Sequence, residues 1–505
     1  MKCDHFSGNP APPETSPVTA CGTERTTSEN NSMKMIFTII LLCVIGTTAY
    51  CQDAPGTFIA KPPQPWISDG IIYQVFLRSF TSEGTLKAAT RRLDDIAELG
   101  ATIIYLSPVM LADTSTNREF WSPRQKTAPG NNPRNPYRIM DYYQIDPEYG
   151  TGDDLKEFIA TAHRLGLRVL LDIVFSRTGP SYSSLTQNPE NYLLDSHGKY
   201  LPDAYNFLRL NVASKGLREY LIKNLEYWIK EYDVDGFRCD SAGDTPVDFW
   251  DEARARVEKM RPDAAMLAEG NVPDQMLRAF DVSYGVHVWN YALRDVFVDG
   301  KPASFLRETW EKQNKRFPAG ALLLRYSDNH DLRRTDMLFG EKGGKAVNVC
   351  NYMLDGVPFI YNGQEIGDGA PIGIWAHYPI LWEAGGLPEK STERNWYKQL
   401  ITLRKSAKVL RSGKTIWLET DKPDAVAAFV RRDGDEEILT VVNVSNRLIN
   451  DAVVALPEVK DGKYDVIFTN GKSKEVTMTK GKIHVPLESF GYLVCKPGKG
   501  AGTDK

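Results

Sequence analysis

Short apolar runs alternate with segments of helical periodicity from about residue 71 onward. The runs are Ile71–Phe76, Thr102–Ser107, Arg168–Val174, Val234–Cys239, Ala264–Ala268, Phe280–Tyr284, Ala321–Tyr326 and Val357–Tyr361. Short apolar runs of this kind are typical of strands that are buried on both faces, as in a parallel sheet. The pattern therefore predicts a series of parallel strands.

The segments between the runs carry apolar residues three and four positions apart. Two such stripes are Leu155, Phe158, Ile159, Ala162 and Leu165, and Leu217, Leu221, Leu225 and Trp228. This spacing places the apolar side chains on one face of a helix. Repeated strand–helix units predict an α/β fold, a (β/α)8 TIM barrel, over residues 66–411. A doubly wound sheet is the competing architecture, but no glycine-rich phosphate-binding turn follows the first run.

Two longer excursions interrupt the repeat. Residues 111–143, approximately, follow the second run and are rich in Pro, Asn and Arg with little periodicity. They predict an extended loop after the second strand. Residues 175–210, approximately, follow the third run and predict a small subdomain there.

After residue 412 the pattern changes to short segments of alternating polarity. The predicted strands are Ala425–Val430, Ile438–Val442, Ala452–Leu456, Tyr464–Phe468, Ile483–Pro486 and Gly491–Cys495. Turn pairs such as Asp433-Gly434 and Asn470-Gly471 separate them. Residues 412–497 are therefore predicted to form a C-terminal all-β sandwich domain.

The N-terminal 51 residues differ from the rest of the chain. Residues 1–32 are rich in Ser, Thr, Pro and Asn, which predicts a disordered extension or an artefact of the assigned start. Residues 33–51 combine a lysine, the short apolar run Ile36–Ile45 and small residues, the layout of a signal peptide. The run is shorter than the roughly 20 residues of a membrane span. We therefore expect a secreted or periplasmic protein, and a membrane anchor remains the alternative.

Composition and charge exclude several classes of protein. Hydrophobic residues make up 42% and charged residues 25% of the chain, as in ordinary soluble globular proteins. The 61 basic and 65 acidic residues leave a net charge of −4, so nucleic acid is not an expected partner. Beyond the leader the cysteines are Cys239, Cys350 and Cys495, an odd and scattered set that predicts neither a disulfide framework nor a zinc site.

Acidic and basic residues gather where the predicted barrel strands end. These residues are Asp172 after the third run, Arg238 and Asp240 at the fourth, Glu269 at the fifth, and Asn329, His330 and Asp331 after the seventh. Catalytic groups of TIM barrels stand at this end of the strands. Paired carboxylates across a cleft are what glycoside hydrolysis requires, one to attack the sugar and one to protonate the leaving oxygen. Each residue alone could serve as a cap or an ion pair, but their joint occurrence favours an active site.

Several motifs make the chemistry more specific. They are Gly236-Phe237-Arg238-Cys239-Asp240, Leu267-Ala268-Glu269-Gly270, Ser327-Asp328-Asn329-His330-Asp331, Tyr105-Leu106-Ser107-Pro108 and Gly356-Val357-Pro358-Phe359-Ile360-Tyr361-Asn362-Gly363-Gln364-Glu365. Together they resemble the signature regions of the α-amylase family of glycoside hydrolases. The resemblance runs from about Trp66 to Arg411, and a C-terminal β-domain follows in that family as well.

The resemblance implies a role for each matching residue. Asp240 would be the nucleophile, Glu269 the general acid and base, and Asp331 the group that stabilises the transition state. Arg238 would orient Asp240, and Asn329 and His330 would belong to the substrate site. Tyr137 would provide an aromatic platform under the sugar. The reaction would retain the anomeric configuration.

The third-strand motif departs from the family pattern. It ends in Ser176 and Arg177, where the family usually has an Asn that binds calcium and a His that touches the substrate. The motif therefore argues against calcium at that place, and no metal site or cofactor is predicted. Arg177 has two open interpretations, a substrate contact or a loop cap. After Asp240, the residues Ser241 to Asp244 also differ from those of typical endo-acting amylases.

Three tryptophans, Trp121, Trp289 and Trp375, fall in predicted loops. Their rings could stack on sugars or could pack within loops.

The sequence leaves three functions to be separated. The favoured one is a secreted retaining hydrolase of starch, maltodextrins or related α-glucosides. A transglycosylase or disaccharide isomerase would share the same site, because both use the covalent intermediate. A non-catalytic membrane-anchored barrel is the third possibility, although crowded carboxylates at the barrel mouth argue against it.

Overall fold

The computed structural model describes residues 58–182, 187–285, 288–371, 373–382, 392–456 and 461–498. The N-terminal extension, the signal segment and the run Ile36–Ile45 lie outside these residues. Within the described ranges, no helix combines the length and the apolar character that a membrane crossing requires.

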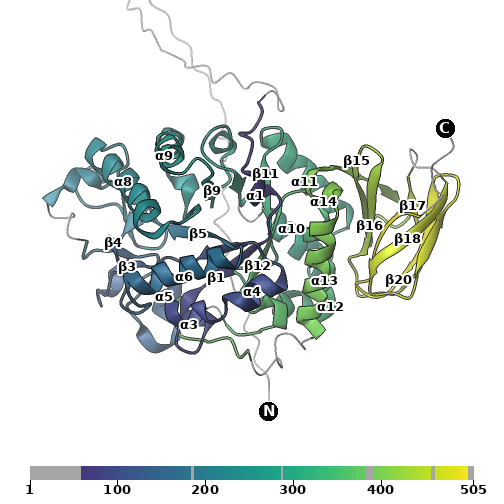
Figure 1. Ribbon diagram of the computed structural model, residues 1–505, viewed down its shortest axis with the longest axis horizontal. Helices are drawn as coiled ribbons and strands as arrows, with labels where there is room; N and C mark the ends of the chain where they lie inside the picture. Colours follow the sequence, from purple (N-terminus) through teal and green to yellow (C-terminus); the bar gives the residue numbers. More distant parts are fainter. Residues whose placement is uncertain are drawn as a thin grey trace, which may run out of the picture. The chain divides into compact units, whose positions relative to one another are not determined.

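Eight parallel strands close into a barrel (Figure 1). In chain order they are β1 (Ile72–Val75), β2 (Ile103–Leu106), β5 (Arg168–Ile173), β8 (Gly236–Cys239), β9 (Ala265–Ala268), β10 (Val282–Ser283), β11 (Leu322–Arg325) and β12 (Val357–Tyr361). Pairing of β1 with β12, for instance Tyr73 with Ile360, closes the ring. The TIM barrel is thus confirmed, and each predicted apolar run contains one barrel strand.

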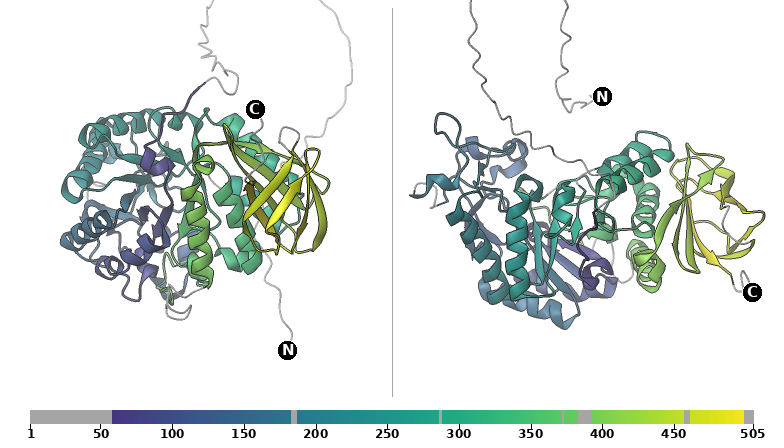
Figure 2. Two further views of the ribbon diagram at one scale, coloured as in Figure 1. Left: turned by 45° about the vertical axis from the view of Figure 1, so that its right-hand side comes forward. Right: turned by 90° about the horizontal axis from the view of Figure 1, so that it is seen from above.

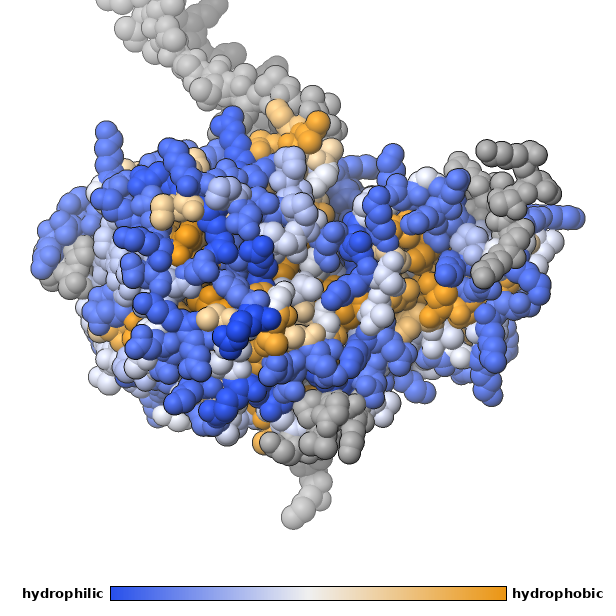
Figure 3. Space-filling view, in the orientation of Figure 1, coloured by the Kyte–Doolittle hydropathy of each residue, from blue (hydrophilic) through white to orange (hydrophobic). Residues whose placement is uncertain are grey.

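Helices surround the barrel (Figure 2). They are α1 (Pro65–Ser68), α2 (Leu77–Phe80), α3 (Leu86–Thr90), α4 (Leu93–Leu99), α6 (Gly152–Arg164), α8 (Lys215–Tyr232), α9 (Val247–Met260), α10 (Val288–Phe297), α11 (Ser304–Arg316), α12 (Thr335–Met353), α13 (Thr392–Ser406) and α14 (Lys408–Ser412). Both predicted stripes lie on helices, α6 and α8, and face the core. Thr151 begins α6 in a capping box with Asp154. On the face drawn in Figure 3, hydrophilic residues cover most of the described surface.

The excursion after β2 has more structure than the predicted extended loop. It contains β3 (Met110–Ala112), η1 (Arg118–Phe120), α5 (Pro123–Thr127) and η2 (Pro129–Asn131), and it returns through β4 (Ile139–Ile145), which pairs with β3. The fully buried Arg138 donates hydrogen bonds to the carbonyls of Phe120, Asp113, Ser115 and Pro133. These polar contacts hold the segment in place together with a few buried apolar side chains, so its order did not show as a hydrophobic period.

The excursion after β5 contains a small two-stranded sheet. Its strands are β6 (Arg177–Thr178) and β7 (Leu208–Arg209), with the short helix η3 (Pro189–Asn191) between them. This sheet positions Arg177, whose backbone pairs with Arg209.

The C-terminal region is all β. One sheet has the order β13 (Lys414–Trp417), β15 (Val426–Asp433), β16 (Glu436–Asn443), β21 (Tyr492–Pro497), β18 (Gly462–Thr469) and β19 (Glu475–Met478). The other contains β14 (Glu419–Thr420), β17 (Ile449–Ala455) and β20 (Lys482–Leu487). Each of the six predicted strands is present, whereas β13, β14 and β19 were not predicted.

Candidate active site

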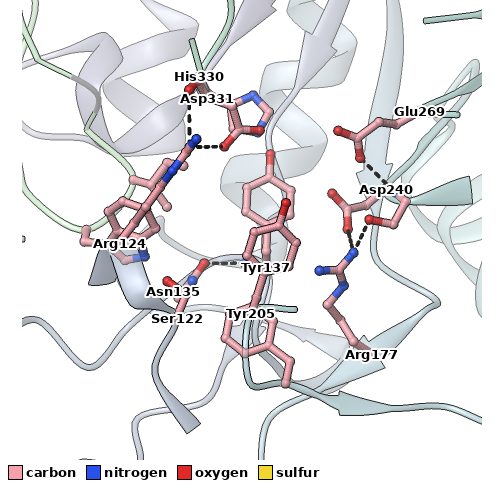
Figure 4. Close-up of a pocket in the computed structure, with 14 residues that line it drawn as sticks. Ser122, Arg124, Asn135, Tyr137, Arg177, Tyr205, Asp240, Glu269, His330 and Asp331 are labelled. Atoms are coloured by element: carbon pink, nitrogen blue, oxygen red, sulfur yellow. Dashed lines mark hydrogen bonds and ion pairs between the residues drawn. The ribbon is translucent and has the colours of Figure 1, made fainter. Parts of the chain in front are cut away.

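A pocket opens at the carboxyl ends of the barrel strands. Its empty space amounts to about 490 Å³, which includes open solvent. Residues singled out from the sequence line it, among them Tyr137, Arg177, Asp240, Glu269, His330, Asp331 and Trp375. Figure 4 shows Asp240 and Glu269 on one side of the pocket and His330 with Asp331 on the other. Residues that are remote along the chain therefore meet in one cavity.

Asp240 and Glu269 share one guanidinium. Arg238 Nη1 lies 2.9 Å from Oδ1 of Asp240, and Nη2 lies 2.9 Å from Oε2 of Glu269. The Arg238 side chain is fully buried at the end of β8. The backbone N–H of Asp240 donates to the carbonyl of Ile173 and that of Glu269 to the carbonyl of Cys239, so the barrel ladder fixes both residues. The shared arginine holds the two carboxylates next to each other.

Asp172 lies beneath these carboxylates. Its Oδ2 accepts hydrogen bonds from the hydroxyls of Tyr105 at 2.7 Å and Tyr137 at 2.9 Å. Arg238 Nη1 lies 2.8 Å from Oδ1 of Asp172. Burial raises the pKa of Asp172 to about 7, against the opposing charge of Arg238. Asp172 thus supports the floor of the pocket through Arg238 and Tyr137.

Asp240, the candidate nucleophile, has a shifted pKa. Burial raises the pKa of Asp240, the negative charge of Glu269 raises it further, and Arg177 and Arg238 oppose both effects. Crowded carboxylates at a buried site produce this behaviour.

His330 is held between two aromatic rings. It stacks on Phe76 with ring centroids 5.6 Å apart and on Tyr137 at 5.1 Å. Its Nδ1 lies 2.8 Å from the side-chain amide of Gln74, and its Nε2 lies 3.2 Å from Oδ2 of Asp331. Burial lowers the pKa of His330, so the ring is neutral near pH 7 and serves as a fixed hydrogen-bonding group.

Arg177 lies in the pocket wall. Its side chain points toward Asp240 (Figure 4), and Nη2 lies 3.4 Å from Oδ2 of that carboxylate. Its Nη1 lies 2.8 Å from Oδ2 of Asp203. Arg177 is therefore an ion-paired part of the pocket wall, and its contact with substrate stays a prediction.

Ser176 and Arg177 also show whether a calcium ion fits at the family's calcium-binding position. The Ser176 hydroxyl, at the family's calcium-binding position, accepts a hydrogen bond from Arg177 Nε at 3.0 Å. A guanidinium so close to the oxygen repels a divalent cation. The residues therefore do not fit calcium at this place. No cluster of three or more His, Cys, Asp or Glu suited to a metal occurs within the described ranges.

Two residues expected in the substrate site lie outside the pocket lining. The buried Asn329 side chain accepts hydrogen bonds from the backbone N–H of Asp331 and of Leu332, so it shapes the turn. Arg238 is fully buried and contacts Asp240, in keeping with the orienting role that the resemblance implies for it. A direct contact of either residue with a sugar stays a prediction.

The three tryptophans have different positions. Trp375 lines the pocket. Trp121 is buried and donates to the carbonyl of Ser115. Trp289 lies in helix α10, not in a loop, and donates to Asn351.

Sequence reasoning missed residues that the two excursions bring to the pocket. They are Ser122, Arg124, Asn135, Tyr205 and Phe207. Arg124, on α5, has its Nη1 3.5 Å from Oδ1 of Asp331. Neither a motif nor a hydrophobic period marks these positions, since they become pocket residues only through the folding of their loops.

Comparison with known proteins agrees with this geometry. The family model described as "Alpha amylase, catalytic domain" matches residues 55–199 and 186–394. A cyclomaltodextrinase of a Bacillus species is 28% identical over 440 residues, which are 75% of this chain and 74% of that protein. The intracellular maltogenic amylase of Bacillus subtilis strain 168 is 28% identical over 382 residues, 70% of this chain and 61% of that protein.

Solved structures show the same architecture. The maltogenic α-amylase AmyB of Thermotoga neapolitana superposes with a TM-score of 0.74 at 24% identity, over 86% of this chain and 99% of that one. An α-amylase of Lactobacillus plantarum gives a TM-score of 0.72 at 25% identity, with the same coverage of both chains.

Proposed function

Since this chain belongs to the α-amylase family of glycoside hydrolases, we propose that it cleaves α-glucosidic bonds of maltodextrins, cyclodextrins or starch by a retaining double displacement. The observation that carries the proposal is the single guanidinium of Arg238 bound to both Asp240 and Glu269. Retaining glycosidases need their two carboxyl groups close together, because one attacks the sugar directly.

The residues divide the reaction into two steps. Asp240 attacks the anomeric carbon while Glu269 protonates the leaving oxygen, and a covalent glycosyl-enzyme forms. Glu269 then takes a proton from water, whose oxygen displaces Asp240. Asp331, on the opposite side of the pocket, binds sugar hydroxyls and stabilises positive charge on the ring. His330 and the ring of Tyr137 position the same sugar.

The substrate class rests on the relatives. Proteins named cyclomaltodextrinase and maltogenic amylase match most of this chain. A product profile on starch, maltotriose, trehalose, sucrose and cyclodextrins tests it. Glucose or maltose from α-1,4-glucans supports hydrolysis, whereas longer oligomers from maltotriose indicate transfer. No turnover of any of these substrates would contradict the proposal.

We also propose that residues 33–51 direct export. The support is the lysine followed by the apolar run Ile36–Ile45 and small residues. N-terminal sequencing of the mature protein from its native host tests this. A start near residue 52 supports export, and retention of the apolar run would indicate a membrane anchor.

A further inference from the structure

A second arginine reaches the proposed nucleophile from a different strand. Arg238 lies 2.9 Å from Oδ1 of Asp240, whereas Arg177, from β6, lies 3.4 Å from Oδ2. The two cations thus approach different oxygens of one carboxylate. At the family's histidine position this chain carries a permanent positive charge, because a guanidinium does not titrate in the physiological range.

The Arg177 guanidinium is fixed from several sides. Arg177 is 3% exposed and is ion-paired to Asp203 at 2.8 Å. Its Nε donates to Ser176, its Nη2 donates to the hydroxyl of Ser241, and its Cζ lies 5.1 Å from the ring centre of Tyr205. An arginine held this way cannot swing out to solvent, so its charge acts on Asp240 throughout the reaction.

We infer that Arg177 is a positioning residue that stabilises the charged form of Asp240 and makes hydrolysis of the glycosyl-enzyme faster than its formation. The inference rests on the proposed function.

The two steps use the Asp240 charge in opposite directions. In the first, an Asp240 oxygen forms a bond to the anomeric carbon, the glycosidic bond breaks, and its electron pair goes to the leaving oxygen, which takes the Glu269 proton. Asp240 loses its negative charge in this step, and a neighbouring cation slows the step because it stabilises the charged form. In the second, water attacks the same carbon and gives its proton to Glu269, while the electron pair of the ester bond returns to Asp240. The charge reappears beside Arg177, and the same cation assists.

Other charged or titratable groups also interact with Asp240 from the elements packed around it. They are Glu269 after β9, Asp172 from β5, Arg238 and Cys239 from β8, Asp203 and Tyr205 from the loop before β7, His330 after β11 and Tyr137 before β4. Glu269 and burial raise the pKa of Asp240, whereas Arg177 and Arg238 lower it. Removing the Arg177 charge should therefore raise the pKa of Asp240.

The test compares the wild type with Arg177→Gln, using 4-nitrophenyl α-maltoside in stopped-flow and steady-state assays. In the variant we expect the acidic midpoint of kcat/KM to move up by about one pH unit. We also expect a burst of nitrophenol of about one per active site, since the glycosyl-enzyme accumulates when its hydrolysis is slowed. From the wild type we expect no burst. An unchanged midpoint together with no burst in Arg177→Gln would overturn the inference.

Two further variants exclude a merely structural effect. Arg209→Gln makes the same chemical change at the backbone partner of Arg177, outside the pocket, and should behave as the wild type. Arg177→His loses its charge as the pH rises, so its burst should be absent at pH 5.5 and present at pH 9. A burst of equal size at both pH values would also contradict the inference, even if Arg177→Gln fails to fold.

Failure of the proposed function has a different signature. A wild type without turnover of any α-glucan or of the nitrophenyl maltoside refutes both statements together. An active wild type with an unaltered Arg177→Gln variant refutes the role of Arg177 alone.

Discussion

Arg124 pairs with Asp331 on the same side of the pocket (Figure 4), although the two are 207 positions apart along the chain. Its Nη1 lies 3.5 Å from Oδ1 and 3.3 Å from the main-chain carbonyl of Asp331. The Arg124 side chain is 57% exposed and that of Asp331 35%. The excursion after β2 thereby orients a carboxylate that follows β11.

Arg124→Ala should weaken substrate binding modestly. An exposed ion pair contributes at most about 1 kcal/mol, so we expect KM for maltodextrins to rise up to about five-fold with little change in kcat. The effect should shrink at high salt. Lys126→Ala, on the same helix α5 but outside the pocket lining, is the matched control. An Arg124→Ala variant with unchanged KM would show that Asp331 needs no such support.

Asp240→Asn and Glu269→Gln should each lower kcat at least about a thousand-fold. The first removes the group that bonds to the sugar, and the second removes the proton donor. Glu269→Gln should retain more activity on a substrate with an activated leaving group, which needs no proton. Thermal melting should show both variants folded. Asp263→Asn, at the other end of β9 and half exposed, is the control, and near-normal kcat in either site variant would refute the assignment.

The acidic limb of the pH profile should reflect Asp240. The nucleophile acts in its ionised form, and burial together with Glu269 raises its pKa above the usual 3.8. Activity should therefore fall as the pH drops through a midpoint above 3.8. Glu269→Gln, measured on 4-nitrophenyl α-maltoside, removes a negative charge and should move that midpoint down. A wild-type midpoint at or below 3.8 in kcat/KM would contradict this ionisation.

Chelators should leave the enzyme unaffected. Arg177 Nε donates to the Ser176 hydroxyl, and its positive charge disfavours a divalent cation at the family's calcium position. We expect kcat and Tm to be the same with EDTA and with EDTA saturated by calcium. A loss of activity or stability that only calcium reverses would show that a metal binds elsewhere in the chain.

Gly236→Ala should destabilise the barrel where it presents the site. Gly236 begins β8 with φ +155°, and an added Cβ would lie 1.9 Å from the carbonyl oxygen of Ala265 on β9. The clash is with backbone, so strands β8 and β9 must separate, at a cost of about 3 kcal/mol or more. Gly216→Ala, on α8 with no atom within 4 Å of the new Cβ, should raise Tm slightly. Equal Tm values for both variants would contradict the close approach.

The sequence by itself determined the barrel and the identity of its carboxylates. Continuous apolar runs mark strands that are buried on both faces, and residues directly after such strands, among them Asp240 and Glu269, must lie at one end of a parallel barrel. The structure of the excursion after β2 was harder to predict, because polar contacts stabilise it. Arg138, for example, donates hydrogen bonds to four backbone carbonyls there.

Only the tertiary structure decided which partners those carboxylates have. Arg177 and Arg124 come from loops without periodicity, and their contacts with Asp240 and Asp331 depend on how β6 and α5 are held in space. Asn329 lies next to His330 in the same motif, yet its amide closes a turn while the imidazole faces the pocket. A hydrophobic pattern along the sequence indicates which side chains become buried. A polar contact between distant segments depends on how the segments and their side chains are oriented in space, which the spacing of residues does not specify.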